Sequence, residues 1–261
     1  MTFSDAKQRF SNRVADYVRY RPGYPEEILP LLKTWCNFRA EHTVADIGSG
    51  TGLLSKLFLD FGNRVLGVEP NAEMRAAGEE FLGGYPNFTS VAGSAEATTL
   101  PSGSVDFVAA GQAFHWFQMP AAREEFHRIL KTGGRVLIIW NELLFDESAF
   151  LREYEALLNR FGTDYARVNE SYPRAEQMVE FFGRNEFTSH SLPNFQEFDF
   201  EGLSGRLRSS SYAPHPGHPQ YEPMMKALRK LFETRHQGGV VRMEYRTRVY
   251  AGKLDYDRTS A

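Results

Sequence analysis

The sequence contains one cysteine, Cys36, in 261 residues. A single cysteine cannot form a disulfide within the chain, and it excludes a zinc site built from several thiolates. Sparing use of cysteine is typical of the reducing cytosol, so we expect a cytoplasmic protein. Two of the seven histidines, His215 and His218, lie three residues apart in a proline- and glycine-rich loop. No acids stand at metal-ligand spacing around them, so we expect no metal site.

Long apolar runs and an excess of basic residues are also missing. No apolar stretch approaches the roughly 18 residues that a membrane-spanning helix needs. Residues 1–10 lack the basic start and the apolar stretch of a signal peptide. The 30 Lys and Arg residues stand against 33 Asp and Glu, which gives a net charge of −3. Because the chain has no basic field, we expect neither nucleic acid nor a membrane as its partner.

The first half of the chain alternates strand-like and helix-like patterns. Short apolar runs typical of strands occupy 44–47, 65–68, 88–91, 105–110 and 135–140. Apolar residues at helical spacing occupy 53–61, 74–81 and 122–130, and Gly133 and Gly134 are expected to end the last of these helices. The alternation predicts an α/β fold, with a parallel sheet covered by helices on both faces. In such sheets, ligands bind beyond the carboxyl ends of the strands.

The second half is less regular. Helical patterns are seen at 150–161, 173–182 and 224–232, and the middle helix has a proline in its first turn. Polar and apolar residues alternate at 241–249, which predicts a strand with antiparallel neighbours. The length fits one large domain. We divide it into a helical cover at 1–40, a ligand-binding core at 41–141, a lid and substrate wall at 145–240, and a final strand at 241–254.

The strongest signal is a glycine-rich loop, DIGSGTG from Asp46 to Gly52, between a predicted strand and a predicted helix. Glycines allow a tight turn and let a ligand approach the main chain. The next strand ends at Glu69, which places a carboxylate where it accepts hydrogen bonds from both ribose hydroxyls of a nucleoside. A dinucleotide loop of the G-x-G-x-x-G type would need glycine where Leu53 stands, and the Lys-Ser/Thr pair of a phosphate-binding P-loop is missing.

The chain resembles the class I S-adenosylmethionine-dependent methyltransferases in five segments: VADIGSGTG at 44–52, VLGVEP at 65–70, GSAE at 93–96, SVDFV at 104–108 and KTGGRVL at 131–137. The resemblance implies a Rossmann-like, doubly wound, mostly parallel sheet of seven strands. It further implies an antiparallel last hairpin and a mainly helical insertion in the C-terminal half. The cofactor implied is S-adenosyl-L-methionine, with S-adenosyl-L-homocysteine as its product.

Two further segments, YRPGYP at 20–25 and AFHWF at 113–117, resemble the branch that contains trans-aconitate methyltransferase and related small-molecule enzymes. We therefore expect a small-molecule acceptor, with a carboxylate or hydroxyl as the methylated group, and a monomer or homodimer. Two other functions remain open at this stage. One is a non-catalytic module that binds the cofactor, and the other is an NAD(P)-dependent oxidoreductase.

The resemblance also implies roles for individual residues. Asp46 faces the amino group of the methionine moiety, Glu69 binds the ribose, and Met74 packs on the adenine. Many relatives carry an acid where this chain has Ser94, so Ser94 and the main chain of Ala95 are expected to bind the adenine instead. The complete set of expected cofactor contacts is Tyr20, Arg21, Asp46, Gly48, Ser49, Gly50, Gly52, Glu69, Pro70, Met74, Ser94, Ala95, Glu96, Gln112, Ala113 and Trp116.

Arg21 and His115 carry the remaining chemistry. A guanidinium binds a carboxylate through two hydrogen bonds, so we expect Arg21 to pair with the methionine carboxylate. His115 follows the fourth predicted strand and is the candidate catalytic base for a hydroxyl acceptor, whereas a carboxylate acceptor needs no base. The alternatives are structural: an Arg21 stacked on tyrosine at the surface, a structural His115, and simple core packing for Met74 and Trp116.

Overall fold

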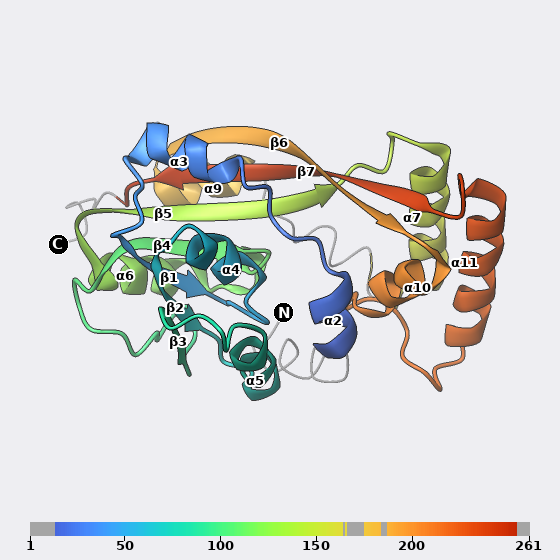
Figure 1. Ribbon diagram of the computed structural model, residues 1–261, viewed down its shortest axis with the longest axis horizontal. Helices are drawn as coiled ribbons and strands as arrows, with labels where there is room; N and C mark the ends of the chain where they lie inside the picture. The colour runs from blue at the N-terminus through green and yellow to red at the C-terminus, as the bar shows by residue number, and fades with distance from the viewer. Residues whose placement is uncertain (1–13, 164, 166–174, 184–186, 255–261) are drawn as a thin grey trace.

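A seven-stranded sheet organises the computed structural model, which describes residues 14–163, 165, 175–183 and 187–254 (Figure 1). The strand order is β3-β2-β1-β4-β5-β7-β6. The first five strands pair in parallel, and β7 pairs antiparallel with both β5 and β6. The strands are β1 (Thr43–Ile47), β2 (Arg64–Val68), β3 (Phe88–Val91), β4 (Val105–Gly111), β5 (Leu130–Leu143), β6 (Phe187–Phe198) and β7 (Val241–Gly252).

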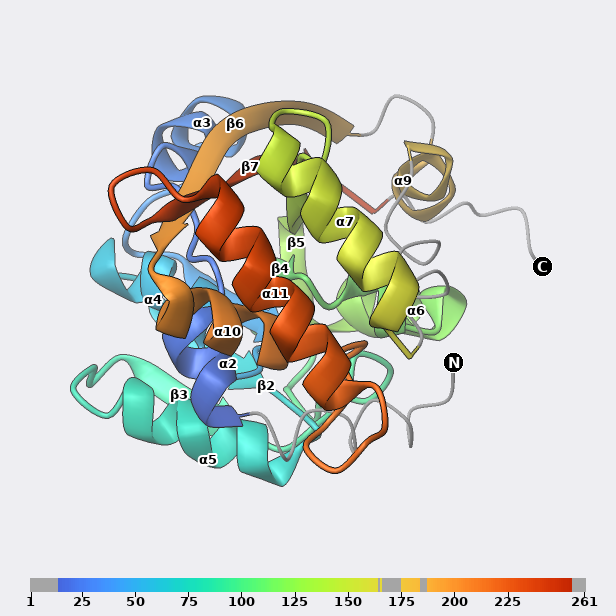
Figure 2. The same cartoon turned by 90° about the vertical axis from the view of Figure 1, so that its right-hand side faces the viewer.

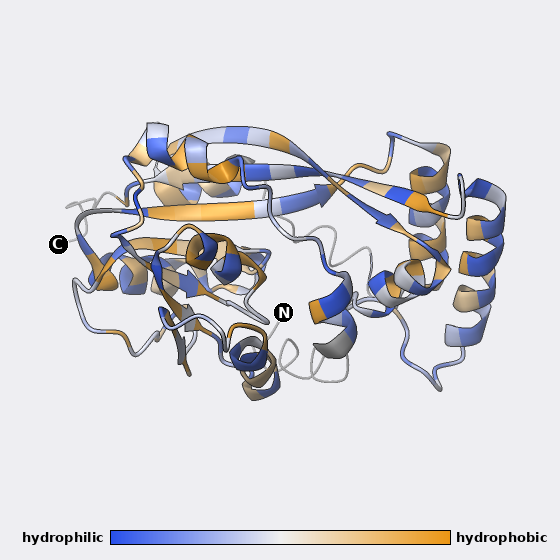
Figure 3. Cartoon of the chain, in the orientation of Figure 1, coloured by the Kyte–Doolittle hydropathy of each residue, from blue (hydrophilic) through white to orange (hydrophobic). Residues whose placement is uncertain are grey.

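Helices cover both faces of the sheet because the central strands are apolar on both sides. Alternate residues of β1 point to opposite faces, and its residues 44–47 are all buried. On one face Val44 packs with α3 (Ile28–Cys36) and α4 (Leu53–Asp60). On the other face Ala45 packs with α6 (Met119–Ile129) and α9 (Ala175–Phe182). Colouring by hydropathy shows the same apolar centre in β4 and in the first part of β5 (Figure 3). The predicted α/β class and mostly parallel sheet are confirmed.

A second apolar core lies where β6 and β7 extend past the parallel strands. It joins Val241, Met243 and Tyr245 of β7 to buried residues of three helices. These helices are α7 (Ala149–Phe161), α10 (Phe200–Arg208) and α11 (Tyr221–Arg235). Figure 2 shows α7 and α11 lying side by side over this end of the hairpin. The β6–β7 hairpin therefore connects the sheet to a helical cap.

One expectation about the elements is wrong in detail. The helix α6 ends at Ile129, and Gly133 and Gly134 lie within the long strand β5. The strand β6 completes the expected antiparallel hairpin, but its exposed residues and Pro193 give no apolar signal that would locate it, as is typical of an edge strand. The range 145–240 contains β6, which belongs to the sheet, and α9, which packs in the sheet core. The expected Pro173 helix start falls outside the described residues.

Within the described ranges, every helix is too short or too polar to cross a membrane.

The helix α2 (Val14–Tyr20) docks on α10 and leads into the segment that carries Arg21. Arg208 of α10 donates to Asp16 of α2 at 2.8 and 3.2 Å. The ring of Tyr20 packs directly on Gly205, where an added Cβ would lie 2.0 Å from the ring. Gly205 thus lets the two helices approach each other closely at Tyr20.

We expect Gly205→Ala to destabilise the protein by about 1–3 kcal/mol, the usual range for overpacking a filled site. Hydrogen exchange of the α2 amides should rise more than that of the central strands, because α2 is the element displaced. Adding Tyr20→Ala to Gly205→Ala should recover part of the loss in a double-mutant cycle. Strictly additive effects of the two substitutions on urea unfolding would contradict this packing.

Candidate functional site

The glycine-rich loop turns sharply at the carboxyl end of β1. The amides of Gly48 and Ser49 both donate to the carbonyl of Val68 in β2, at 2.8 and 3.1 Å. Gly48 and Gly50 have φ values of 68° and 57°, in the left-handed region that favours glycine. An added Cβ on Gly48 would lie 2.6 Å from the Cβ of Ala113, so no side chain fits there.

Glu69 fastens this loop to the end of β2. One carboxylate oxygen accepts from the Gly50 amide at 3.0 Å, and the other accepts from the Asn71 amide at 2.8 Å. Asn71 in turn caps α5 (Ala72–Phe81) by accepting from the amides of Glu73 and Met74. Glu69 is only 8% exposed, and it lines the adjoining smaller cavity.

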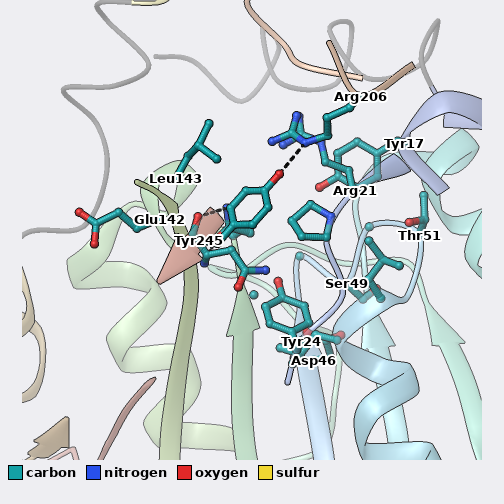
Figure 4. A pocket seen from close by; sticks show the side chains of 18 of the residues that line it. Tyr17, Arg21, Tyr24, Asp46, Ser49, Thr51, Glu142, Leu143, Arg206 and Tyr245 are labelled. Carbon is teal, nitrogen blue, oxygen red and sulfur yellow. Dashed lines mark hydrogen bonds between the residues drawn. The ribbon is translucent and has the colours of Figure 1, made fainter. Parts of the chain in front are cut away.

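Two cavities adjoin the loop. The smaller, about 100 Å³, lies between the ends of β2 and β4 and is mainly apolar. The larger, about 270 Å³, extends from the loop toward α10 and β7 and is rich in hydroxyl and charged groups. Figure 4 shows the larger cavity, with Asp46 and Tyr24 at one end and Arg21 and Arg206 at the other. The residues that line both cavities are Tyr17, Gly48, Gly50, Gly111 and Gln112.

Asp46 is the buried acid of the larger cavity. Its side chain is 1% exposed, and Ser55 of α4 donates to one of its oxygens at 2.7 Å. The other oxygen has no hydrogen-bond partner among the described residues. Burial raises the Asp46 pKa to about 7, the Ser55 hydrogen bond opposes the rise, and the charge of Glu69 adds to it. Near neutral pH, Asp46 is therefore poised to lose its proton when a cation approaches.

The turn after β4 is held by an amide pair. Gln112 has φ 56°, which is unusual for a residue with a side chain. Its side-chain oxygen accepts from the Asn141 amide at 2.6 Å, and its side-chain nitrogen donates to the Asn141 carbonyl at 3.3 Å. Thr247 and Asn194 then donate to the Asn141 side chain. This network joins β4, β5, β6 and β7 at the cavity wall.

Most of the predicted site residues line one of these two cavities. Five do not: Tyr20, Gly52, Ser94, Glu96 and His115. The predicted residues around the smaller cavity are Gly48, Gly50, Glu69, Pro70, Met74, Ala95, Gln112, Ala113 and Trp116. Those around the larger cavity are Arg21, Asp46, Gly48, Ser49, Gly50 and Gln112.

Four of the five residues outside the cavities have clear structural contacts. Tyr20 packs on Gly205 and donates to Glu201 at 3.4 Å, and Tyr17, one turn earlier, reaches both cavities instead. Gly52 is the N-cap residue of α4, and an added Cβ there would lie 2.5 Å from the Leu82 side chain. Ser94 forms a β-bridge with Ala97. Glu96 accepts from the Gln118 amide at the start of α6.

His115 lies in a short 3₁₀ turn, Phe114–Trp116, beside the smaller cavity but not in its lining. Its ring centroid is 4.5 Å from that of Trp116 and 5.1 Å from that of Trp140. Burial, together with the charge of Arg21, lowers the His115 pKa to about 3. The imidazole is neutral at physiological pH but is a weak base, and efficient proton transfer needs a pKa near the working pH. This placement favours the structural alternative.

Sequence reasoning missed several groups of the larger cavity. Tyr17 and Tyr24 flank Arg21 in the sequence, and their aromatic character was the available signal. Arg206, Tyr212 and Tyr245 come from distant segments that show no local motif. No group of three His, Cys, Asp or Glu side chains placed to hold a metal occurs in the part of the chain that the structure covers.

Comparisons with known proteins agree with this geometry. Residues 45–138 match the model of a family described as a methyltransferase domain. An uncharacterized methyltransferase of Schizosaccharomyces pombe is 34% identical over 227 residues, which cover 86% of this chain and 87% of that protein. An uncharacterized methyltransferase of Mycobacterium bovis is 33% identical over 159 residues, which cover 60% of this chain and 62% of that protein.

Solved structures share the fold. A putative type II methyltransferase from Anaeromyxobacter dehalogenans superposes with a TM-score of 0.61 at 22% identity, covering 90% of this chain and 98% of that chain. Phosphoethanolamine N-methyltransferase 2 of Haemonchus contortus, in complex with S-adenosyl-L-methionine, has a TM-score of 0.56 at 18% identity and covers 97% of this chain and 59% of that chain. The family match, the S. pombe relative and the shared fold place the chain among the class I S-adenosylmethionine-dependent methyltransferases.

Proposed function

We propose that the protein transfers a methyl group from S-adenosyl-L-methionine to a carboxylate or hydroxyl oxygen of a small molecule. The observation that carries this proposal is the pair of cavities that meet at the glycine-rich loop. The smaller cavity has an acid and apolar walls, as a nucleoside requires. The larger has ionisable groups of both signs, as an amino acid requires, and it has room for an acceptor beside it.

The residues present fit the adenosyl part of the cofactor. Glu69 presents carboxylate oxygens to the smaller cavity from the end of β2, where ribose hydroxyls can donate to them. Met74, Ala95 and Trp116 supply apolar walls for a flat base. Gly48 lines both cavities with main chain alone, and Ala113 fills the place where a Cβ would lie.

The methionine part is proposed to lie between Asp46 and Arg21 in the larger cavity. The unpartnered Asp46 oxygen is an acceptor for an ammonium group. Arg21 donates to the carbonyl of Ser209 at 2.8 Å and stacks 4.8 Å from the Tyr17 ring centroid. Its buried Nε has no partner among the described residues, and no described acid pairs with it. A carboxylate would satisfy this guanidinium.

When bound, S-adenosyl-L-methionine supplies an electrophilic methyl group whose sulfur leaving group departs without charge. The chain then has to align the acceptor and exclude water. The volume of about 270 Å³ favours a small acceptor, because pockets that bind drug-sized ligands measure about 300–1,000 Å³. Since His115 is a weak base outside the cavity lining, we favour an acceptor that needs no proton removed by it.

The proposal is tested by titrating purified protein with S-adenosyl-L-homocysteine in a calorimeter. A second experiment measures the transfer of a radiolabelled methyl group from S-adenosyl-L-methionine to a panel of small acids and alcohols. Saturable binding with methylated product supports the proposal. If S-adenosyl-L-homocysteine does not bind, the proposed cofactor is wrong. If it binds but no acceptor of the panel is methylated, the result favours a non-catalytic module that binds the cofactor.

Gly48→Ala should abolish measurable binding of S-adenosyl-L-homocysteine. The added Cβ meets Ala113 and occupies the face that the ligand approaches, and the left-handed backbone adds about 1–2 kcal/mol of strain. Gly103→Ala is the matched control, because Gly103 has φ 60° but nothing within 4 Å of an added Cβ. Equal weakening of binding in both variants, measured by calorimetry, would show that strain alone accounts for the loss.

Asp46→Asn should stabilise the protein at about pH 8 and have little effect near pH 4. Asp46 keeps its proton up to about pH 7 in the folded state, whereas the ordinary pKa is 3.8. Between these values the folded state binds more protons, so the contribution of Asp46 to the free energy of unfolding falls as pH rises. The difference between the two pKa values corresponds to at most about 4 kcal/mol in the free energy of unfolding at high pH.

Urea unfolding of both proteins at the two pH values measures this difference. The same substitution should weaken binding of S-adenosyl-L-homocysteine at about pH 8, because the charge that faces its amino group is lost. A variant that is less stable than the natural protein at high pH would refute the proposed ionisation of Asp46.

A further inference from the structure

Arg206 is a buried guanidinium in the wall of the larger cavity. It lies on α10 and is only 5% exposed. Its Nε donates to the Tyr245 hydroxyl at 3.2 Å (Figure 4). One of its terminal nitrogens donates to the Ser210 hydroxyl at 3.0 Å. No Asp or Glu of the described ranges forms an ion pair with it. Arg206 is thus a buried cation held by neutral groups.

Such a cation is costly unless a ligand compensates its charge, because burial removes hydration that neutral hydroxyls restore only in part. The surroundings of Arg206 are rich in hydrogen-bond donors. The hydroxyl of Tyr154 is buried without a partner, and the Tyr212 hydroxyl makes no hydrogen bond to a described residue. The Tyr245 hydroxyl donates to Gln196 at 3.0 Å while it accepts from Arg206. This cluster lacks acceptors, which an oxyanion supplies.

The charge balance of the cavity leads to the same conclusion. Arg21 and Arg206 face Asp46 and Glu142, but Glu142 already accepts from Arg248 at 2.8 Å. The proposed cofactor brings one carboxylate, one ammonium and one sulfonium, so its arrival adds net positive charge. Its single carboxylate can neutralise one of the two guanidinium groups. The loaded cavity then still holds a cation without a counter-ion.

We propose that Arg206 binds a carboxylate of the methyl acceptor, and that the natural acceptor is a small organic acid. The hydroxyl of Tyr212 assists as a neighbouring hydrogen-bond donor, whereas the hydroxyl of Tyr245 already donates to Gln196 and holds Arg206 in place. A guanidinium suits this task because its planar donors match both oxygens of a carboxylate. This inference rests on the proposed function, and it assigns acceptor specificity to α10 and the loop that follows it.

The test uses the full chain loaded with S-adenosyl-L-homocysteine. Succinate, glutarate and benzoate are titrated by calorimetry, each against its amide, with phenyl phosphate as a further probe. We expect at least one acid to bind at least about tenfold more tightly than its amide. Arg206→Met should remove this preference, and Arg206→Lys should keep part of it. Arg229→Met is the matched control, because Arg229 is exposed on α11 and lines neither cavity.

Stability and cofactor affinity provide independent readouts. Arg206→Met should keep or raise the melting temperature, since replacing a buried charge by an apolar side chain is often neutral or stabilising. It should leave the dissociation constant of S-adenosyl-L-homocysteine within about twofold, whereas Arg21→Met raises that constant at least about tenfold.

Several results would overturn the inference. These are equal binding of acids and amides to the natural protein, preference for phenyl phosphate alone, unchanged preference in Arg206→Met, or loss of cofactor affinity in Arg206→Met. A natural protein that binds no S-adenosyl-L-homocysteine would instead refute the proposed function itself.

Discussion

The hydrogen bond from the Gly50 amide to the Glu69 carboxylate is the contact on which the site depends. It helps to fix a loop whose glycines have left-handed backbone conformations. The same carboxylate accepts from Asn71, which caps α5, so one side chain aligns the ends of β1 and β2 with the start of a helix. Because both cavities adjoin this loop, a displaced Glu69 would alter both together.

The two apolar cores have different tasks. The sheet core places the glycine-rich loop, Asp46 and Glu69 at the carboxyl ends of parallel strands. The second core, at the far end of the β6–β7 hairpin, carries α10 and with it Arg206. The larger cavity lies between them, so its chemistry is shared by a rigid sheet and a helical cap. Arg21 links the two parts, because it donates to the carbonyl of Ser209, the residue that follows α10.

The ionisable groups of the larger cavity are arranged at some cost to stability. Asp46 is buried with one oxygen unpartnered, and Arg206 is buried without a described counter-ion. Groups left in this state are commonly found where a ligand completes them. In this protein they lie at opposite ends of one cavity, which suits a ligand pair with a cation at one end and an anion at the other.

Local sequence determined the parallel strands, the glycine-rich loop and Glu69, because apolar periodicity and glycine conformation act over a few residues. It could not decide which tyrosine of α2 reaches the cavities, since the packing of Tyr20 on Gly205 directs Tyr17 there instead. Nor could it show that His115 lies against two tryptophans, or that β6 joins the sheet as an edge strand.

Arg206 gave no signal in the sequence, because its burial arises only when the hairpin brings α10 to a loop that lies more than 150 positions earlier in the sequence. Residues whose roles depend on such long-range packing are decided by the tertiary structure alone.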